Sequence, residues 1–404
     1  MFTQMRRALP TAPVSKLFVF VGLVWAAMVG SASIVLILTY LGASSAQIGT
    51  FIAISSVLSM VFQPVWGMRS DKTGSPRKVL CMCLVGMTVF FGAVMLTGNF
   101  YIAAALLFLE VIFRCGVIGL LDSHTLSEVN AMPGLQYGHI RLAGSVFFGS
   151  LSLLYSVVIN NFGVLAIIPI SVGVSVVAIG FGLLVAKGVS EKGATAGEGV
   201  HMAKPHLKTD ALSLIKNKRY ISLILFIALS ALALQPLWVF LVEYVRQVGG
   251  NPGHVPLIHA LRCVVEIPLF IFVGTACKRV SSLKLMVVGI CFMFVYVLVL
   301  LFATSLVWVI VAHLVGGTPG FIFGLTGRLR RLNEVTPDSV RSTSITLMGT
   351  VELGLGAIIG NFVAGFVLEA HGTRALSLLS LGALVVAAGM LVYMVATKGA
   401  AQRG

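Results

Sequence analysis

Long apolar segments recur along almost the whole chain, and they constrain its fold more than any other feature. In the first half they occupy residues 16–41, 45–66, 79–97, 100–129, 138–159 and 163–186. In the second half they occupy residues 219–243, 253–275, 283–303, 307–326, 342–367 and 374–396. About 20 apolar residues cross a bilayer as a helix, and none of these runs alternates apolar and polar residues as barrel strands do. The pattern predicts an all-α membrane protein with twelve transmembrane helices.

The composition supports a lipid environment. Hydrophobic residues make up 58% of the chain and charged residues 10%, whereas soluble domains carry about 25% charged residues. The net charge of +15 would suggest a nucleic-acid partner in a soluble protein. Here the basic residues lie in short loops between apolar runs, without a basic and aromatic groove, so we expect no nucleic-acid partner.

Basic residues alternate between the connecting segments. Every second connecting segment is rich in lysine and arginine, whereas the segments between them carry only Arg246 and Arg374. The basic set comprises Arg6, Arg7, Lys16, Arg69, Lys72, Arg77, Lys78, Lys278, Arg279, Lys284, Arg328, Arg330, Arg331, Arg341, Lys398 and Arg403. By the positive-inside rule, both termini face the cytoplasm of a multi-pass protein in the inner cell membrane.

The amino-terminal segment has a second possible interpretation. Residues 31–33 have the small side chains of a signal-peptidase site, and they follow a basic and then an apolar stretch. The apolar run continues to Leu41, however, which is long enough to span a bilayer. We therefore expect a retained first helix.

The longest polar stretch separates two sets of six helices. It predicts an amino-terminal six-helix bundle (1–187), a cytoplasmic linker (188–218) and a carboxy-terminal six-helix bundle (219–404). The segment from Asp210 to Arg219 could form a short amphipathic helix at the membrane surface.

The cysteines give no sign of a metal or redox site. They lie in or beside apolar runs, without paired spacing or companion histidines, so we expect small buried side chains, no metal site and no cofactor. They are Cys81, Cys83, Cys115, Cys263, Cys277 and Cys291.

Ionisable residues inside the apolar runs are the candidate functional groups, because each costs about 2.5–3.5 kcal/mol at the bilayer centre. Glu110, Arg114 and Asp122 fall within an arc of roughly 120° on one predicted helix. Glu110 and Arg114 are four residues apart and can pair, either as a self-contained ion pair or as part of a site. Asp122 and Arg141, on successive helices, reach comparable depth and could meet.

A second group of ionisable residues lies in the second half. His259, Arg262 and Glu266 share one face of a predicted helix, and Glu352 lies in a later one. His313 could be a proton carrier or a histidine that is simply hydrogen-bonded to a neighbouring helix.

The segment from Gly67 to Lys78 reads GMRSDKTGSPRK and resembles the loop signature of the major facilitator superfamily. The resemblance implies six plus six helices and a gating loop that latches the two halves on the cytoplasmic side. It carries that role to Gly67, Asp71, Lys72, Gly74 and Arg77. The alternative is a plain cytoplasmic turn whose charges set the topology.

A narrower resemblance is to the oligosaccharide and phenylpropionate proton symporters of that superfamily. It rests on residues 42–49, 63–67, 137–144 and 333–341, together with Asp122, Glu266 and Pro268. The resemblance implies that Asp122 and Arg141 hold the substrate and that Glu266 takes part in proton coupling. The chain departs from the family in having Phe148 where a tryptophan stacks on sugar, and Gly316 and Gly317 where a glutamate would be expected.

These observations predict proton-coupled uptake of a sugar, an oligosaccharide or a small organic acid by alternating access. The expected substrate-binding residues are Asp122, Arg141, Phe148, Trp25, Trp238, Arg114 and Arg262. The expected proton-coupling residues are Glu266, Glu352, Glu110 and His313. The expected partners are a small solute, protons and the lipid bilayer, and the chain is expected to be a monomer.

Two alternatives share the same fold. One is an exporter of small hydrophobic compounds by proton antiport, and the other is a membrane receptor or scaffold that transports nothing. Costly intramembrane carboxylates argue against a scaffold. The chain has no GK[ST] phosphate-binding motif and no nucleophile motif, so we do not expect an enzyme.

Overall fold

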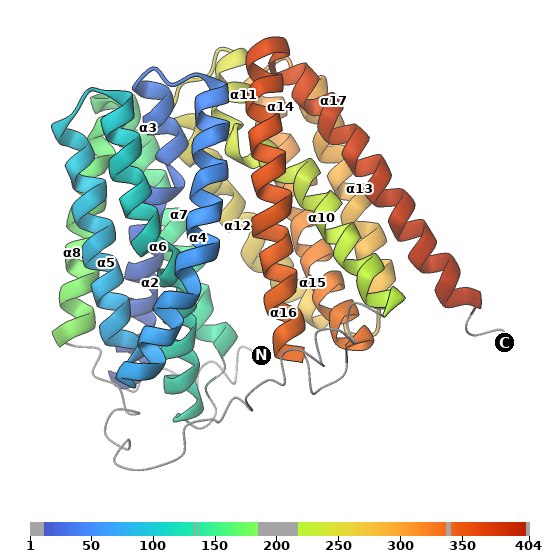
Figure 1. Ribbon diagram of the computed structural model, residues 1–404, viewed down its shortest axis with the longest axis horizontal. Coiled ribbons are helices and arrows are strands. Elements are labelled where there is room, and N and C mark those ends of the chain that lie inside the picture. The colour runs from blue at the N-terminus through green and yellow to red at the C-terminus, as the bar shows by residue number, and fades with distance from the viewer. Residues whose placement is uncertain (1–11, 133–134, 136, 185–216, 337–340, 401–404) are drawn as a thin grey trace. The chain divides into compact units, whose positions relative to one another are not determined.

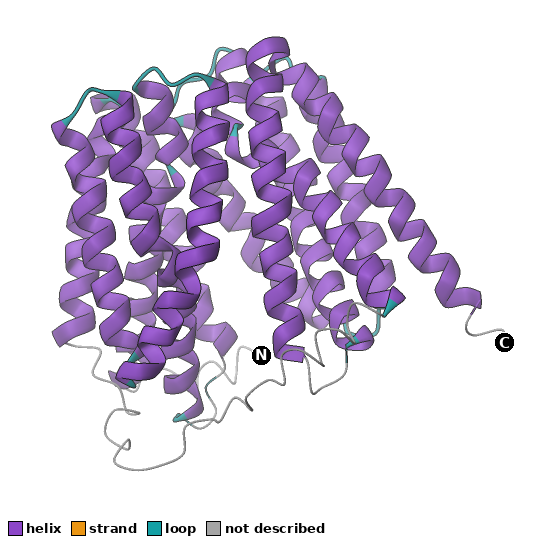
Figure 2. Ribbon diagram, viewed as in Figure 1, coloured by secondary structure: helices purple, strands orange, loops and turns teal. Residues whose placement is uncertain are grey.

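The computed structural model describes residues 12–132, 135, 137–184, 217–336 and 341–400. Every regular element in these ranges is a helix, and they contain no strand (Figure 2). The helices of the first half are α2 (Ala12–Ala32), α3 (Ile34–Tyr40), α4 (Ser45–Thr73), α5 (Pro76–Ala93), η1 (Val94–Leu96), α6 (Phe100–Asn130), α7 (Tyr137–Phe162), η2 (Val164–Ala166) and α8 (Ile167–Leu184).

The second half adds two π-helical turns to its α-helices. Its elements are α10 (Lys218–Val239), α11 (Leu241–Gln247), α12 (His254–Thr275), α13 (Ser282–Leu301), α14 (Leu306–Val311), η4 (Ala312–Gly317), α15 (Thr318–Val335), α16 (Arg341–Thr350), η6 (Val351–Gly356) and α17 (Ala357–Ala400). The π-helical turns are η4 and η6, and such turns are rare and often occur at functional sites.

The predicted fold class is confirmed. Eleven helical segments of the described chain are long and apolar enough to cross a membrane. The last of them contains Gly372, whose φ of 74° and ψ of −175° are not helical. The chain turns back there, so α17 has an ascending and a descending arm (Figure 1). Counting the two arms separately gives the twelve predicted spans.

Two predicted helix ends were wrong. We expected ends at residues 66 and 326, but α4 continues to Thr73 and α15 to Val335. The apolar pattern stops where the bilayer core stops, whereas a helix satisfies its own backbone hydrogen bonds and can continue into the interface. Basic residues that we assigned to loops therefore lie on helices.

The chain packs as two compact units. One contains described residues within 1–43, 57–199 and 252–263, and the other contains those within 44–56, 200–251 and 264–404. Helices α4 and α12 contribute to both units. The predicted domain boundaries stay a prediction, because the linker at 188–218 lies almost entirely outside the described residues. The same holds for most of the amphipathic helix expected from Asp210.

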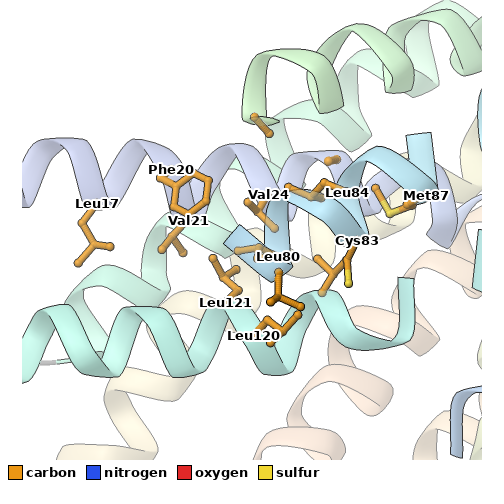
Figure 3. Packing of buried hydrophobic residues seen from close by; sticks show 14 of the residues in the cluster. Leu17, Phe20, Val21, Val24, Leu80, Cys83, Leu84, Met87, Leu120 and Leu121 are labelled. Atoms are coloured by element: carbon orange, nitrogen blue, oxygen red, sulfur yellow. The ribbon is translucent and has the colours of Figure 1, made fainter. Parts of the chain in front are cut away.

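The core of the first unit forms where α2, α5 and α6 meet (Figure 3). The buried side chains that pack together here are Leu17, Phe20, Val21, Val24, Leu80, Cys83, Leu84, Met87, Leu120 and Leu121. Because lipid tails are as apolar as leucine, such packing stabilises the bundle through close van der Waals contact more than through exclusion of water.

Close helix crossing in the second unit depends on one glycine of a facing pair. A Cβ added to Gly289 of α13 would lie 2.6 Å from the backbone nitrogen of Gly324 on α15. A Cβ added to Gly324 would meet no atom within 4 Å. The two positions therefore face each other but differ in the space around them.

We expect Gly289→Ala to lower the melting temperature of the detergent-solubilised protein, because overpacking costs about 1–3 kcal/mol. Gly324→Ala is the matched control and should leave the melting temperature unchanged or raise it slightly, since alanine favours a helix. Equal effects of the two substitutions would contradict this account of the crossing.

Candidate functional site

A chain of polar contacts joins α6 and α7 in the first unit. The hydroxyl of Tyr137 donates to Asp122 Oδ1 over 2.7 Å, and the Arg141 side chain lies close to the same hydroxyl. Asp122 and Arg141, which the sequence analysis suggested could meet, thus both lie beside a third residue, Tyr137. Tyr137 was missed because it lies just outside the predicted apolar run, although it stands one helical turn before Arg141.

An aromatic pair covers the other side of this arginine. The guanidinium carbon of Arg141 lies 3.9 Å from the centroid of the Trp25 ring on α2. The edge of Trp25 also faces Phe148, with ring centroids 6.5 Å apart. A Cβ on Gly144 would approach an Arg141 nitrogen to 2.6 Å, so glycine is needed for this stacking. Three residues predicted separately as substrate-binding therefore form one cluster.

The buried indole N–H of Trp25 has no hydrogen-bond partner within the described part of the chain. A buried donor without a partner costs about 1–3 kcal/mol, so it favours an acceptor that arrives with a ligand. With Asp122, Tyr137 and Arg141, the cluster offers a ring face, a carboxylate, a hydroxyl and several N–H donors. These groups suit a solute that has both a ring and hydroxyl groups.

Glu110, on α6, is held by two polar side chains. It is fully buried. One carboxylate oxygen accepts from Arg114 Nε over 3.1 Å, and the other accepts from the Ser31 hydroxyl over 2.6 Å. This geometry fits the alternative in which Glu110 and Arg114 form a self-contained ion pair. The roles assigned to Glu110 and Arg114 in transport stay predictions.

His313 lies at the centre of an aromatic cluster in the second unit. It is fully buried in the π-helical turn η4. Its Nδ1 lies 2.9 Å from the carbonyl of Val309 and must carry a proton to donate to it. Its Nε2 lies 3.0 Å from the hydroxyl of Tyr296. Trp238 stacks on Tyr296, with centroids 5.6 Å apart, and meets the imidazole edge-on.

This arrangement can accommodate a second proton on the imidazole. In neutral His313, Nε2 accepts from the hydroxyl of Tyr296; in the cation, Nε2 would donate to the oxygen of that hydroxyl after a rotation of its O–H bond. Both states keep the hydrogen bond, which is a useful property in a proton carrier. Trp238 and His313, predicted in different roles, share one cluster.

Glu352 has a partner that the sequence analysis had placed in a loop. Arg328 Nη1 lies 2.8 Å from Glu352 Oε1, and the two side chains are 8% and 20% exposed. Arg328 lies on α15 and Glu352 in the π-helical turn η6. The continuation of α15 beyond the apolar run brings the arginine beside the carboxylate, and the apolar pattern alone could not show this.

Glu266 and Arg262 lie one turn apart on α12, and both are partly buried. Arg262 belongs to the first compact unit and Glu266 to the second. The substrate role of Arg262 and the coupling role of Glu266 stay predictions.

The predicted gating loop is mostly helix. Gly67, Asp71 and Lys72 lie on the last turns of α4, and Asp71 and Lys72 are exposed. The chain turns at Gly74, whose φ of 61° favours glycine. Arg77 is only 5% exposed, and its Nη1 donates to the Gly182 carbonyl over 2.6 Å, which docks α5 on α8.

The expected basic loop after residue 326 needs the same correction, because Arg328, Arg330 and Arg331 lie on α15 and Arg341 begins α16. Arg330 Nη1 donates to the Cys277 carbonyl over 2.8 Å, just after the end of α12. Arg331 pairs with Glu334 over 3.0 Å, and Glu334 also accepts from Ser282. These residues hold helix ends together. Four of the six cysteines are buried as predicted, whereas Cys115 is only partly buried and Cys291 is exposed.

Comparison with known proteins identifies the family. The sequence matches the MFS_1 like family over residues 18–379. It is 24% identical over 358 residues to the uncharacterized transporter YwbF of Bacillus subtilis (strain 168), covering 87% of this chain and 85% of that protein. It is 23% identical over 326 residues to the maltose permease of Geobacillus stearothermophilus, covering 81% and 80%.

Solved structures agree on the fold. The crystal structure of the nucleoside transporter NupG superposes with a TM-score of 0.77 at 16% identity, over 96% of this chain and 99% of that one. The relatives and the structural neighbours are membrane transporters, not enzymes. The helices, the match over most of the sequence and these likenesses agree: the chain belongs to the MFS_1 like family and is a multi-pass membrane transporter of the major facilitator superfamily.

Proposed function

We propose that the chain takes up a sugar- or nucleoside-type solute together with protons, by alternating access. The observation that carries this proposal is the cluster of Asp122, Tyr137, Arg141 and Trp25, which combines a ring face with donors and acceptors for hydroxyl groups. The nature of two similar proteins, a maltose permease and a nucleoside transporter, supports the same solute class.

The solute would bind by exchanging partners within this cluster. Stacking on Trp25 would orient its ring, and its hydroxyl groups would accept from Arg141 and the free indole N–H and donate to Asp122. An anionic solute would be attracted by the positive charge of Arg141 but repelled by the nearby carboxylate of Asp122. The presence of Asp122 therefore favours a neutral, hydroxyl-rich solute over an anion.

Proton coupling would reside in the second half of the chain. Glu266 is our first candidate for the proton site, because it is a partly buried carboxylate within a membrane span. Glu352 and His313 are further candidates. Glu352 has the charged partner Arg328, and His313 has the hydroxyl of Tyr296, which can hydrogen-bond to either protonation state of the imidazole. Solute binding and protonation become linked if each stabilises the same conformation.

The orientation is part of this proposal. The alternation of basic residues favours a chain in the inner cell membrane with both termini in the cytoplasm. Uptake would then move solute towards the side on which the termini lie. We further propose that the monomer is the transporting species.

The experiment is transport by the full chain in proteoliposomes. Maltose, nucleosides and phenylpropionate would be screened with and without an inward proton gradient. We expect one sugar or nucleoside to accumulate only with the gradient. Glu266→Gln should abolish accumulation but retain exchange of labelled for unlabelled solute, because exchange needs no net proton transfer.

A glutamate outside the proposed coupling site provides the control for Glu266→Gln. Glu369, a glutamate that accepts from the Ala46 backbone, lies far along the chain from Glu266, and Glu369→Gln should leave accumulation intact. Undiminished uphill uptake by Glu266→Gln would remove that residue from the coupling mechanism. Accumulation of phenylpropionate alone would refute the proposed solute class, and efflux driven by the same gradient would indicate an exporter.

A further inference from the structure

An apolar groove opens on the surface of the second unit, where α10 packs against α17. Its volume is about 540 Å³, within the usual range of ligand pockets. Its lining is mostly hydrocarbon from α10, the end of η6 and both arms of α17, including Leu225, Leu229, Ile359, Val386, Gly389 and Met390. Leu225, Ile359 and Val386 are each about half exposed, so the groove is open on its outer side.

A second cavity continues this groove towards the start of α10. Its volume is about 460 Å³, and it shares Met390 and Tyr393 with the first. Its other lining residues are Lys218, Ile221 and Ser222. Lys218 is exposed and is the first residue of α10. The continuous groove is therefore apolar for most of its length and carries a positive charge and a tyrosine side chain at one end.

A ligand of this groove must match both its apolar part and its positively charged end. The apolar part lies between membrane spans, and Tyr393 at its end is the one residue of its lining with a hydrogen-bonding side chain, so the rest of it suits a hydrocarbon chain. The ammonium of Lys218 attracts a phosphate, and tyrosine is enriched where a membrane meets water. Basic pockets between transmembrane helices bind anionic lipid head groups.

We infer that this groove binds one anionic phospholipid, with an acyl chain along the apolar part and the head-group phosphate at Lys218. A zwitterionic lipid would bring its own positive charge close to the same lysine and bind more weakly. The groove shares no residue with the solute cluster of Trp25 and Arg141, and it does not depend on the proposed transport function.

The test is native mass spectrometry of the full chain in detergent, titrated with phosphatidylglycerol or with phosphatidylcholine of the same acyl chains. We expect the wild type to retain one tightly bound phosphatidylglycerol. Lys218→Gln should weaken its binding about fivefold, which corresponds to one basic residue near a charged head group. Lys284→Gln, which removes an exposed lysine outside the groove, should have no effect.

A second pair of variants tests the apolar part. A Cβ on Gly389 would meet no atom within 4 Å, and the same is true of Gly382 on the same arm of α17, outside the groove. Gly389→Leu should fill the groove and abolish the tightly bound lipid, whereas Gly382→Leu should retain it. Equal binding of the two lipids by the wild type, or equal lipid loss from both glycine variants, would overturn the inference.

Discussion

Uptake by Arg141→Gln should fall about a hundredfold at low solute concentration. The substitution removes the guanidinium that stacks on Trp25 and contacts Tyr137, and it leaves the carboxylate of Asp122 without its positive neighbour. A hydrogen bond to a charged group is worth about 1.5–3 kcal/mol, and about 3 kcal/mol corresponds to this change in affinity. The measurement is initial uptake in proteoliposomes as a function of solute concentration.

Three companion variants separate the parts of this cluster. Arg141→Lys keeps the charge but loses the planar fork, so we expect it to recover only part of the activity. Tyr137→Phe breaks the bridge to Asp122 and should raise the concentration needed for half-maximal uptake. Tyr101→Phe, on an exposed part of α6, is its control and should behave as the wild type. Wild-type uptake by Arg141→Gln in a folded protein would exclude this cluster as the solute site.

Arg328→Gln should lower the melting temperature of the purified protein by about 5 °C or more. The arginine is 8% exposed and its bond to Glu352 is 2.8 Å long, so its removal leaves a carboxylate in a poorly solvated place. Breaking a buried pair in this way costs about 3–5 kcal/mol, and each kcal/mol lowers the melting temperature of a medium-sized domain by about 2–4 °C.

A double variant that also replaces Glu352 decides how a loss of stability in Arg328→Gln is interpreted. In Arg328→Gln/Glu352→Gln no charge remains unpaired, so most of the lost stability should return. A double variant as unstable as the single one would show that Arg328 acts through packing and not through the ion pair. If Glu352 also takes part in coupling, the double variant should be stable yet unable to accumulate solute. A purely structural pair would give a stable variant that still accumulates solute.

The sequence by itself determined the architecture, because the bilayer imposes one rule on every segment. A run of about 20 apolar residues must be a helix, and twelve such runs predict twelve spans whatever their contacts. It also identified the ionisable residues that need explanation, since charge inside a membrane is costly wherever it occurs. Asp122, Arg141, Glu110 and His313 were all found in this way.

Only the tertiary structure decided which of these residues meet. Tyr137 lies beside both Asp122 and Arg141 because α7 begins next to the end of α6, and Arg328 pairs with Glu352 because α15 continues beyond its apolar run. The same is true of His313, whose neighbours Trp238 and Tyr296 come from two other helices. Hydrophobicity is a property of each segment alone, whereas a site depends on the rotation and depth of several helices at once, and those are set by side-chain packing.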